Sequence, residues 1–580
     1  MSNLCLSSRA AASVLEIFLI RLNRQDVKMN ITQWHPKSDA VHWYMQELSS
    51  RVVAQSGIPS DRHHLGKLIL QCFKDAPDFV LQIDGATDDI ETFGSALTRS
   101  VQCATAFRKL GLKHGDVIVL MAPNHIHLTI PMYAAFYLGI AVAGVDVTLE
   151  RNDLRKILNY NTPKMVFCQS EKVSDVRFAL QDLNFETQIV TFDKSEESIN
   201  FVELLGKCGS DVTMEDFKVE DFDPADTISL LMETSGTTGI PKSVAASHKN
   251  MVISVPYLWI TYNKFPSPTR LSVIFSPAHW YSALFQFVFS PILRHTRLQS
   301  SAPMTKEHAF YLINKYRPTF TMVCPNMLAD FLKVNDRKKC DFTCFETIHA
   351  GGSAVHPSLF GDMRAVSPNT YLIVNYGMTE VSGMAFSFDA NYPDSLGKPL
   401  QNLEHRLVDP ETLRDVTESH VTGELWLKGP GVFKGYYNNP EATAQVMMEG
   451  GWLKTGDIMY RDEQSYYYYV DRMKLLMVYK NKRISPLEIE SVIAKHPGVF
   501  QVAVTGIPHE EDGDLPVACI VPHAGYKIIA QEIKDLIKDT LADTKQLRGG
   551  VIFLKELPQT STSKINRRKL ASVALSMERE

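Results

Sequence analysis

Short apolar segments rich in β-branched residues alternate with helix-like segments from about residue 60 to about residue 470, and this alternation restricts the possible folds most. Residues 93–110 and 130–137 carry apolar side chains at helical spacing. The strand-like segments are 116–121, 164–168 and 187–192. Strands that alternate with helices form parallel sheets whose faces the helices cover. The sequence therefore predicts an α/β fold with a large N-terminal domain of parallel-rich sheets covered by helices.

The pattern changes near Asp471. A charged segment (DRMKLLMVYKNKR) leads into Ser485-Pro486, a pair typical of a helix N-cap and the first helical residue. Further strand-like and helix-like segments follow at 501–506, 517–521, 528–541 and 551–554. About 110 residues of this mixed pattern suffice for a small α+β domain. We expect three parts, namely an extension that is in part disordered or targeting (1–55), an N-terminal domain (56–471) and a C-terminal domain (472–580).

Composition and charge exclude several classes of protein. Hydrophobic residues are 45% and charged residues 22% of the chain, and the net charge is -5, so no basic excess indicates a nucleic-acid partner. The longest apolar stretch, 130–145, is shorter than the ~20 residues of a membrane span, so we expect no integral membrane segment. The nine cysteines form no CxxC pair, which favours free thiols in a reducing, intracellular compartment.

Residues 1–28 allow two interpretations. Serines and arginines surround an apolar run at 14–20, which is weakly similar to a mitochondrial presequence, although Glu16 breaks the apolar face. The favoured interpretation is an untargeted, poorly ordered extension, with Met29 as an alternative start. The last residues, 577–580, form no peroxisomal targeting tripeptide. We expect a cytoplasmic protein, with mitochondrial import as the alternative.

The densest motif is Thr234-Ser235-Gly236-Thr237-Thr238-Gly239-Ile240-Pro241-Lys242, which follows a strand-like run at 227–232. Glycines let backbone N–H groups turn towards one anion, hydroxyl groups add donors, and the lysine adds positive charge. This combination predicts a polyphosphate-binding loop, with a Ser/Thr/Gly-rich surface turn as the alternative. It is not the Walker motif, because Pro241 precedes the lysine where that motif has glycine.

The loop resembles the phosphate loop of the adenylate-forming (AMP-binding) superfamily, which contains acyl-CoA synthetases, 4-coumarate–CoA ligases, insect luciferases and adenylation domains of peptide synthetases. Matching motifs recur in the family's order from about residue 60 to about residue 575. The resemblance implies an acid–thiol ligase that uses ATP and Mg²⁺ to activate a fatty or aromatic carboxylic acid as its acyl-adenylate, with CoA as co-substrate. It also implies that ATP and the acid bind the N-terminal domain, that the C-terminal domain is mobile, and that a peroxisomal location is a further alternative.

Three motifs of the N-terminal domain resemble the family's nucleotide site. By this resemblance Tyr376 stacks on adenine, Thr379 bonds the α-phosphate and Glu380 holds Mg²⁺. The backbone of 351–353 would line the adenine pocket. Asp457 would accept hydrogen bonds from both ribose hydroxyls, which the two oxygens of one carboxylate allow. The motif residues are Gly351, Gly352, Ser353, Asn375, Tyr376, Gly377, Thr379, Glu380 and Asp457.

Three further motifs complete the predicted site. Asp471-Arg472-Met473-Lys474 resembles the family's hinge, which implies that Arg472 reaches the ribose and Lys474 is the pivot. Lys564 matches the family's C-terminal catalytic lysine, whose charge would offset the repulsion between the attacking carboxylate and the α-phosphate. His279 begins a segment (HWYSA) similar to the acyl-pocket helix and would contact the phosphate side; a core aromatic cluster is the alternative.

The chain departs from the family's pattern at several positions, two of which bear on thioester formation. Ser563 replaces the glycine before the catalytic lysine, and Asn481 replaces a glycine in the loop after the hinge; Ser243 and Val478 are further replacements. That loop faces the pantetheine channel in the family, and an asparagine side chain takes room that glycine leaves free. We therefore expect an intact adenylation site and slower transfer to CoA.

Two other functions stay open. One is a luciferase-like oxygenase acting on the adenylate, but residues 252–264 contain no arginine to match the luciferin-side arginine of beetle luciferases. The other is a nucleotide-binding protein with weakened thioester-forming activity. Trp280, Tyr281 and Phe285 indicate an apolar pocket for the acid, whose chain length the sequence does not define.

Overall fold

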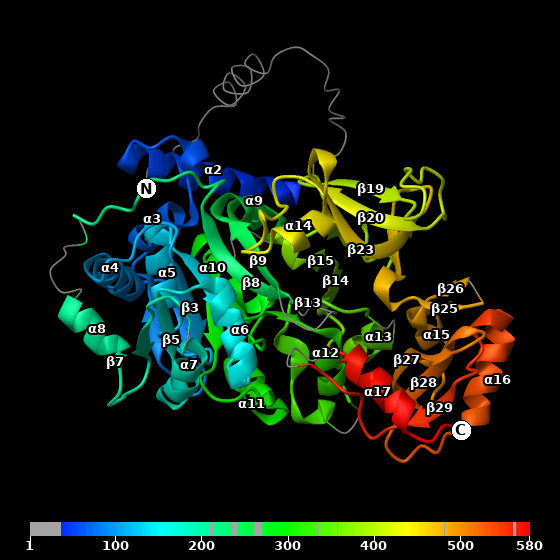
Figure 1. Cartoon of the computed structure of the whole chain (residues 1–580). Coiled ribbons are helices and arrows are strands. Elements are labelled where there is room, and N and C mark those ends of the chain that lie inside the picture. Colours follow the sequence, from blue (N-terminus) through cyan, green and yellow to red (C-terminus); the bar gives the residue numbers. More distant parts are fainter. Residues whose placement is uncertain are drawn as a thin grey trace, which may run out of the picture.

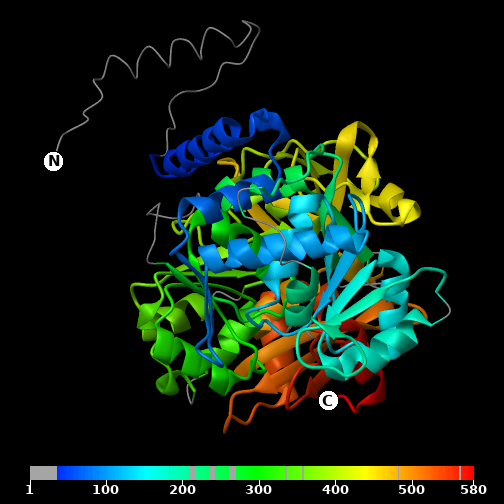
Figure 2. The same cartoon turned by 90° about the vertical axis from the view of Figure 1, so that its left-hand side faces the viewer.

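The computed structural model describes residues 36–580, except for 182, 209–213, 215, 235–241, 260–269, 334–335, 356–357, 481 and 561–563. A large N-terminal body lies beside a smaller C-terminal unit, drawn in orange and red (Figure 1). A five-stranded sheet, yellow in Figure 1, lies next to both. Figure 2 views the molecule from the side of the N-terminal body, with the orange and red C-terminal unit behind it. None of the helices in the described ranges has the length and apolar character of a membrane-spanning helix.

The first sheet of the N-terminal body has eight strands in the order β21-β9-β8-β4-β3-β5-β6-β7. The pairs from β8 to β7 are parallel, whereas β9 is antiparallel to both β8 and β21. All five residues of β3 are buried, as expected of a central parallel strand covered on both faces. The strands are β3 (Val117–Met121), β4 (Ala141–Gly144), β5 (Met165–Cys168), β6 (Gln188–Thr191), β7 (Ile199–Asn200), β8 (Ile228–Thr234), β9 (Lys242–Ser247) and β21 (Gly435–Tyr436).

The second sheet has seven strands in the order β14-β13-β12-β10-β11-β1-β2, and only the β1–β2 pair is antiparallel. Its strands are β1 (Val80–Asp84), β2 (Ile90–Thr92), β10 (Leu271–Val273), β11 (Thr296–Gln299), β12 (Phe320–Val323), β13 (Thr347–Gly351) and β14 (Tyr371–Asn375). Two short hairpins follow, formed by β15 (Gly377–Met378), β16 (Gly383–Met384), β17 (Phe386–Ser387) and β18 (Lys398–Pro399).

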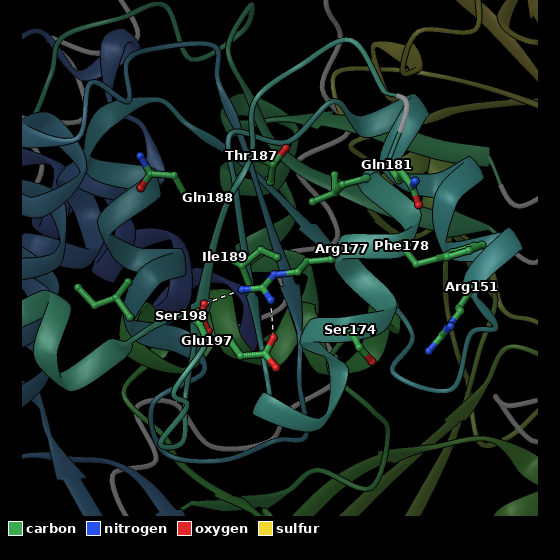
Figure 3. Close-up of a pocket in the computed structure, with 12 residues that line it drawn as sticks. Arg151, Ser174, Arg177, Phe178, Gln181, Thr187, Gln188, Ile189, Glu197 and Ser198 are labelled. Carbon is green, nitrogen blue, oxygen red and sulfur yellow. Dashed lines mark hydrogen bonds and ion pairs between the residues drawn. The ribbon is translucent and has the colours of Figure 1, made fainter.

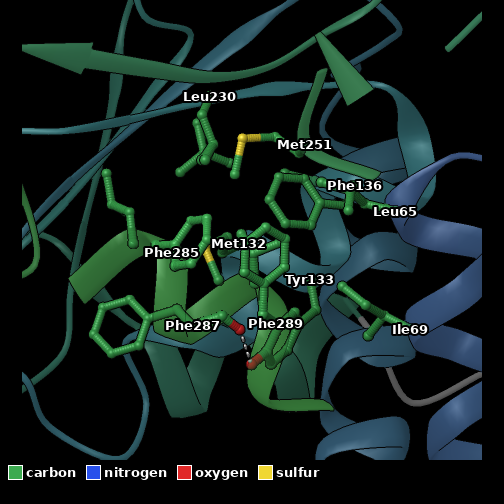
Figure 4. Packing of buried hydrophobic residues seen from close by; sticks show 14 of the residues in the cluster. Leu65, Ile69, Met132, Tyr133, Phe136, Leu230, Met251, Phe285, Phe287 and Phe289 are labelled. Carbon is green, nitrogen blue, oxygen red and sulfur yellow. Dashed lines mark hydrogen bonds between the residues drawn. The ribbon is translucent and has the colours of Figure 1, made fainter. Parts of the chain in front are cut away.

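Helices of the N-terminal body pack around a large apolar core, part of which Figure 4 shows. Tyr133 and Phe136 of α5 are fully buried close to Phe285 of α10. The Tyr133 hydroxyl donates to the Phe287 carbonyl over 2.9 Å and accepts from the buried guanidinium of Arg297. Burying one such aromatic side chain contributes about 1.5–3 kcal/mol. This packing fixes α10, at whose start the predicted acid-pocket residues lie.

The helices of this body are α2 (Pro36–Ser56), α3 (Leu65–Asp75), α4 (Phe93–Lys109), α5 (Thr129–Leu138), α6 (Arg151–Asn161), α7 (Val173–Leu180), α8 (Phe201–Cys208), α9 (His248–Trp259), α10 (Tyr281–Leu293), α11 (Lys306–Tyr316), α12 (Pro325–Phe331), α13 (Ser358–Val366) and α14 (Pro440–Val446). Part of the expected extension belongs to the fold, because Val41 and Leu48 of α2 are fully buried and the Tyr44 hydroxyl donates to the Ile292 carbonyl over 2.7 Å. Residues 1–35, with the proposed targeting segment, lie outside the described residues.

The five-stranded sheet has the order β19-β20-β23-β22, with β24 paired to β23. The C-terminal unit has the order β26-β25-β28-β27, with β29 paired to β28. The strands are β19 (Glu404–Val408), β20 (Gly423–Lys428), β22 (Met447–Met448), β23 (Trp452–Arg461), β24 (Tyr467–Arg472), β25 (Met477–Tyr479), β26 (Lys482–Ile484), β27 (Val499–His509), β28 (Gly513–Pro522) and β29 (Gly550–Phe553). The C-terminal helices are α15 (Pro486–Ile493), α16 (Ala530–Thr540) and α17 (Arg567–Ser576).

The α/β architecture predicted from the alternating pattern is confirmed. The helix expected at 93–110 is α4, and the strand expected at 116–121 is β3. The Ser485 hydroxyl accepts a hydrogen bond from the Glu488 N–H, so it caps α15 as predicted. The strand expected at 501–506 is longer, because β27 pairs with β28 from Val499 to His509. The cysteines whose thiols the structure describes are not in disulfide bonds, namely Cys72, Cys103, Cys168, Cys324, Cys340, Cys344 and Cys519.

Candidate active site

Several predicted site residues stand at the carboxyl ends of strands, which is where ligands bind in open α/β sheets. Thr234 ends β8, Gly351 ends β13 and Asn375 ends β14. Gly351 and Asn375 are partners in the parallel β13–β14 pair. A Cβ atom at position 351 would lie 2.8 Å from the Asn375 carbonyl oxygen, so the two strands approach as closely as they do because residue 351 is glycine. The ends of β13 and β14 therefore lie side by side.

Tyr376, Asp457 and Arg472 form one cluster, although they are far apart in the sequence. The Tyr376 hydroxyl donates to Asp457 Oδ2 over 2.6 Å, and Arg472 Nε lies 3.0 Å from Asp457 Oδ1. The β23–β24 register places Asp457 opposite Arg472. Burial raises the pKa of Asp457, which is 1% exposed, and Arg472 opposes that rise. The cluster presents a positioned carboxylate with a hydroxyl and a guanidinium on either side.

Glu380 lies next to the end of the predicted phosphate loop. Its side chain is buried, and Oε1 accepts a 2.9 Å hydrogen bond from the Tyr436 hydroxyl. Lys242 Nζ lies 4.8 Å from the centre of the Tyr436 ring. Burial raises the pKa of Glu380, and the bond from Tyr436 opposes this. Tyr436 was not singled out in the sequence, because nothing in its neighbourhood along the chain indicates that it bridges Lys242 and Glu380.

The phosphate loop joins β8 and β9 as a hairpin. Thr234 and Lys242 face each other in the register, and the Thr234 hydroxyl donates to the Lys242 carbonyl over 3.3 Å. The predicted phosphate ligands between them, Ser235, Gly236, Thr237, Thr238 and Gly239, lie outside the described residues. The structure thus places both ends of the loop beside Tyr436 and Glu380.

The other predicted residues occupy the rim and the hinge. Gly352 and Ser353 are exposed just beyond β13, and Thr379 is partly buried beside Glu380. A Cβ atom at Gly377 would lie 2.3 Å from the Gly383 carbonyl oxygen, so the β15–β16 hairpin needs glycine there. Lys474 is exposed in the short turn between β24 and β25.

Lys564 reaches this site from the C-terminal unit. A Cβ atom at Gly352 would lie 3.4 Å from Lys564 Cε and 3.7 Å from its Nζ. Gly352 has a φ of 90°, in the region that favours glycine. Burial and then the charge of Arg472 lower the pKa of Lys564. The structure therefore brings Lys564 against the 351–353 segment, between the two halves of the chain.

His279 pairs with an acidic residue that the sequence analysis missed. His279 Nε2 lies 3.5 Å from Asp146 Oδ2, and both side chains are buried. A Cβ atom at Gly144 would lie 2.9 Å from His279 Cα, so glycine at the end of β4 permits this approach. Burial lowers the pKa of His279, and Asp146 opposes this. Burial, reinforced by Asp146, raises the pKa of Glu233 to about 8. Only the fold brings these three groups together.

We expect Glu233→Gln to be more stable than the wild type at pH 9 and close to it at pH 5. An unfolded Glu titrates near about pH 4.3, whereas folded Glu233 has a pKa of about 8. Because the folded state holds the proton more tightly, the stability from the neutral carboxyl is complete below about pH 4 and is lost as pH rises through about 8. The free energy of unfolding should fall by up to about 1.4 kcal/mol per pH unit in this window.

Urea denaturation of both proteins between pH 5 and pH 9 measures this difference. Glu346→Gln, at an exposed position, is the matched control and should follow the wild-type profile. Identical pH profiles for Glu233→Gln and the wild type would show that Glu233 ionises at its ordinary pH.

One of the predicted acid-pocket residues, Tyr281, carries a buried hydroxyl. The Tyr281 oxygen has no hydrogen-bond partner among the residues that the structure describes. A Cβ atom at Gly383 would lie 3.8 Å from that oxygen and 3.4 Å from the Ser254 hydroxyl. The Ser254 hydroxyl already donates to the Asn250 carbonyl, and Phe285 is buried next to Tyr281. A buried hydroxyl without a partner costs about 1–3 kcal/mol, so a ligand group that hydrogen-bonds to Tyr281 would gain this energy.

A shallow groove of about 810 Å³ lies at another edge of the molecule, where β6, β7 and α7 meet (Figure 3). Arg177 crosses it and donates to the Glu197 carbonyl over 2.6 Å, besides pairing with its carboxylate. Arg151 is paired with Asp175 over 2.6 Å. The charges in the groove already have partners, and none of the predicted site residues that the structure describes lines it.

The chain matches two family models, described as AMP-binding enzyme over residues 71–437 and as AMP-binding enzyme C-terminal domain over residues 488–564. A luciferin 4-monooxygenase from Photuris pensylvanica is 31% identical over 491 residues, which cover 82% of this chain and 88% of that protein. The peroxisomal OPC-8:0-CoA ligase 1 of Arabidopsis thaliana is 28% identical over 502 residues, or 85% of this chain and 90% of that protein.

Among solved structures, an anthranilate CoA ligase in complex with anthranoyl-AMP superposes with a TM-score of 0.80. Its sequence is 21% identical, and the match covers 90% of this chain and 98% of that chain. At this identity the likeness shows the fold. The match extends over both the N-terminal body and the C-terminal unit.

Proposed function

The chain belongs to the AMP-binding enzyme family, and we propose that it activates a carboxylic acid as its acyl-adenylate and transfers the acyl group to CoA. In the first step a carboxylate oxygen attacks the α-phosphate of ATP and pyrophosphate leaves. In the second step the CoA thiol takes the acyl group and AMP leaves. The observation that carries the proposal is the close approach of Lys564 to Gly352, near the Tyr376–Asp457–Arg472 cluster.

The residue roles follow from the chemistry of the cluster. The Asp457 carboxylate has two oxygens that can accept hydrogen bonds from the ribose hydroxyls, and Arg472 holds it in place. Lys564 supplies a positive charge where two anions must meet. Thr379 and the loop from Thr234 to Lys242 would hold the phosphates.

Glu380 fits the role of a magnesium ligand. Magnesium is usually held by one or two carboxylates together with substrate phosphates, and it neutralises phosphate charge when bound. The described residues contain no cluster of three His, Cys, Asp or Glu side chains that could hold a metal alone. Glu380 is a buried carboxylate beside the ends of the phosphate loop, which suits a cation that arrives with ATP.

We expect Glu380→Gln to raise the Mg²⁺ concentration needed for half-maximal adenylation by roughly tenfold or more, because the amide carries no charge to hold the cation. Lys242→Ala should raise the KM for ATP through loss of a phosphate contact. Initial rates measured against Mg²⁺ at fixed ATP test this, with Glu404→Gln, at an exposed position, as the control. An unaltered Mg²⁺ dependence in Glu380→Gln would remove Glu380 from the metal site.

The acid pocket combines an apolar wall with the unpartnered Tyr281 hydroxyl. We therefore propose a fatty or aromatic acid that carries a polar group able to hydrogen-bond to Tyr281. The test of the function is acid-dependent exchange of pyrophosphate into ATP, followed by detection of acyl-CoA, across pairs of acids with and without a hydroxyl group. Tyr281→Phe should lose the preference within each pair, by about tenfold. Absence of exchange with every acid would refute the function.

The step to CoA needs a separate measurement. Asn481 and Ser563, which we proposed to slow this step, lie outside the described residues. Single-turnover experiments that follow adenylate and acyl-CoA separately test that proposal, and Asn481→Gly should speed only the second step. Light emission or O₂ uptake from the adenylate would instead support a luciferase-like oxygenase. Formation of the adenylate without formation of the thioester would support a nucleotide-binding protein with weakened thioester-forming activity.

We keep the proposed domain boundary at residues 471 and 472. β24 ends at Arg472 and β25 begins at Met477, with the exposed Lys474 between them, which suits a pivot. For location we keep the cytoplasm as the proposal, with mitochondria or peroxisomes as alternatives. Imaging of the chain with and without residues 1–28 separates cytoplasmic from mitochondrial placement.

A further inference from the structure

One aromatic ring lies beside the lysine proposed for catalysis. Lys564 Nζ lies 5.6 Å from the centre of the Trp280 ring, within the ~6 Å range of a cation–π interaction. A Cβ atom at Gly352 would lie 3.4 Å from Lys564 Cε and 3.9 Å from Trp280 Cζ2. The indole and the Gly352 backbone therefore form two sides of a slot that receives the lysine side chain.

Hydrogen bonds to neighbouring residues fix the backbone of Trp280. It is the residue that precedes α10, and its N–H donates to the Pro277 carbonyl over 3.0 Å. Its own carbonyl accepts from the N–H groups of Ala283 and Leu284, at 3.0 and 3.1 Å. Because α10 is anchored in the apolar core, the N-terminal body fixes the backbone position from which the indole faces Lys564 of the C-terminal unit.

The charges around Lys564 explain why an indole is useful there. Burial and the nearby charge of Arg472 both lower the pKa of Lys564, so its positive charge is disfavoured before substrates arrive. The described residues show no ion pair between Lys564 and a carboxylate, and Cys324 and Glu380 only oppose the lowering of its pKa. The face of an indole attracts a cation without neutralising it, which leaves the charge available for the substrate.

We propose that Trp280 is a positioning residue that receives the Lys564 ammonium through a cation–π contact and holds it for the adenylation step only. The inference rests on the proposed function and deepens it, because it separates Trp280 from the apolar acid pocket to which its sequence position assigned it. The contact joins the two halves of the chain, so it is lost when the C-terminal unit moves away for transfer to CoA.

The first test is a double-mutant cycle followed by single-turnover measurement of adenylate. Trp280→Leu should form adenylate about 3- to 30-fold more slowly, equivalent to about 0.7–2 kcal/mol, whereas Trp280→Phe should retain part of the rate. In the Lys564→Ala background, Trp280→Leu should cause no further loss in the rate of adenylate formation, because Trp280 acts only by positioning Lys564. Trp43→Leu, at a position 65% exposed on α2, is the matched control and should behave as the wild type.

The second measurement starts from preformed adenylate and CoA. Trp280→Leu should transfer the acyl group at the wild-type rate. Equal loss in both half-reactions, or a loss that persists in the Lys564→Ala background, would overturn the positioning role. A change confined to the KM for the acid would show that Trp280 only lines the acid pocket, and would overturn it as well.

A third readout does not require activity. Trace acetylation of the protein alone by acetic anhydride, quantified by peptide mass spectrometry, should label Lys564 several-fold faster in Trp280→Leu than in the wild type. The exposed Lys474 is the internal reference and should label equally in both. Equal labelling of Lys564 would refute the contact. Absence of adenylate with every acid, together with faster labelling, would refute the proposed function and leave the contact supported.

Discussion

Lys564→Ala is expected to form acyl-adenylate about 10²- to 10³-fold more slowly than the wild type, because removal of one preorganised group that stabilises transition-state charge costs this much in other enzymes. The Lys564 side chain extends from the C-terminal unit and lies beside Gly352 of the N-terminal body. Its charge is needed most when a carboxylate and a triphosphate approach each other. The affinity for ATP should change far less, because Arg472, Asp457 and the phosphate loop are untouched.

The measurement is single-turnover adenylate formation at saturating ATP and acid, with ATP affinity obtained from equilibrium binding. Lys569→Ala provides the control, since Lys569 is exposed on α17 only five positions further along. An unchanged rate of pyrophosphate release in Lys564→Ala would remove the lysine from the mechanism. A loss of ATP binding equal to the loss of rate would make it a binding residue.

The fold could be predicted largely because local patterns and global packing agree. The β-branched run at 117–121 is buried on both faces in a parallel sheet, and helix signatures such as Ser485-Pro486 operate within a few residues. The helix α2 could not be predicted, because it has no conspicuous apolar face in the sequence, yet Val41 and Leu48 are buried in the apolar core.

The candidate site could be predicted only where one motif carries several residues together. Thr234 to Lys242 or Asn375 to Glu380 can be found as contiguous segments. The residues that contact these motifs could not be found in this way, because they come from distant strands and loops. Tyr436 reaches Glu380, Asp146 reaches His279, and Trp280 reaches Lys564 only after both sheets and the C-terminal unit have assembled.

Asp457→Ala is expected to raise the KM for ATP by roughly tenfold to a hundredfold and to leave the KM for the acid unchanged. The carboxylate is 1% exposed and makes close contacts with Tyr376 and Arg472, so its orientation is fixed before ATP binds. Loss of one hydrogen bond to a charged group costs about 1.5–3 kcal/mol, which corresponds to a roughly tenfold to hundredfold loss of affinity. Adenylation rates measured against ATP and against acid separate the two constants.

The same substitution leaves the Arg472 guanidinium without its carboxylate, so the melting temperature should also fall. Asp457→Asn distinguishes the two effects, because the amide keeps one acceptor oxygen and the volume but not the charge. We expect it to restore most of the stability and only part of the ATP affinity. Asp415→Ala, an exposed residue paired loosely with Arg406 at 3.7 Å, is the control for loss of a surface carboxylate. An unaltered KM for ATP in a folded Asp457→Ala protein would mean that the carboxylate holds Arg472 and Tyr376 in place without touching the nucleotide.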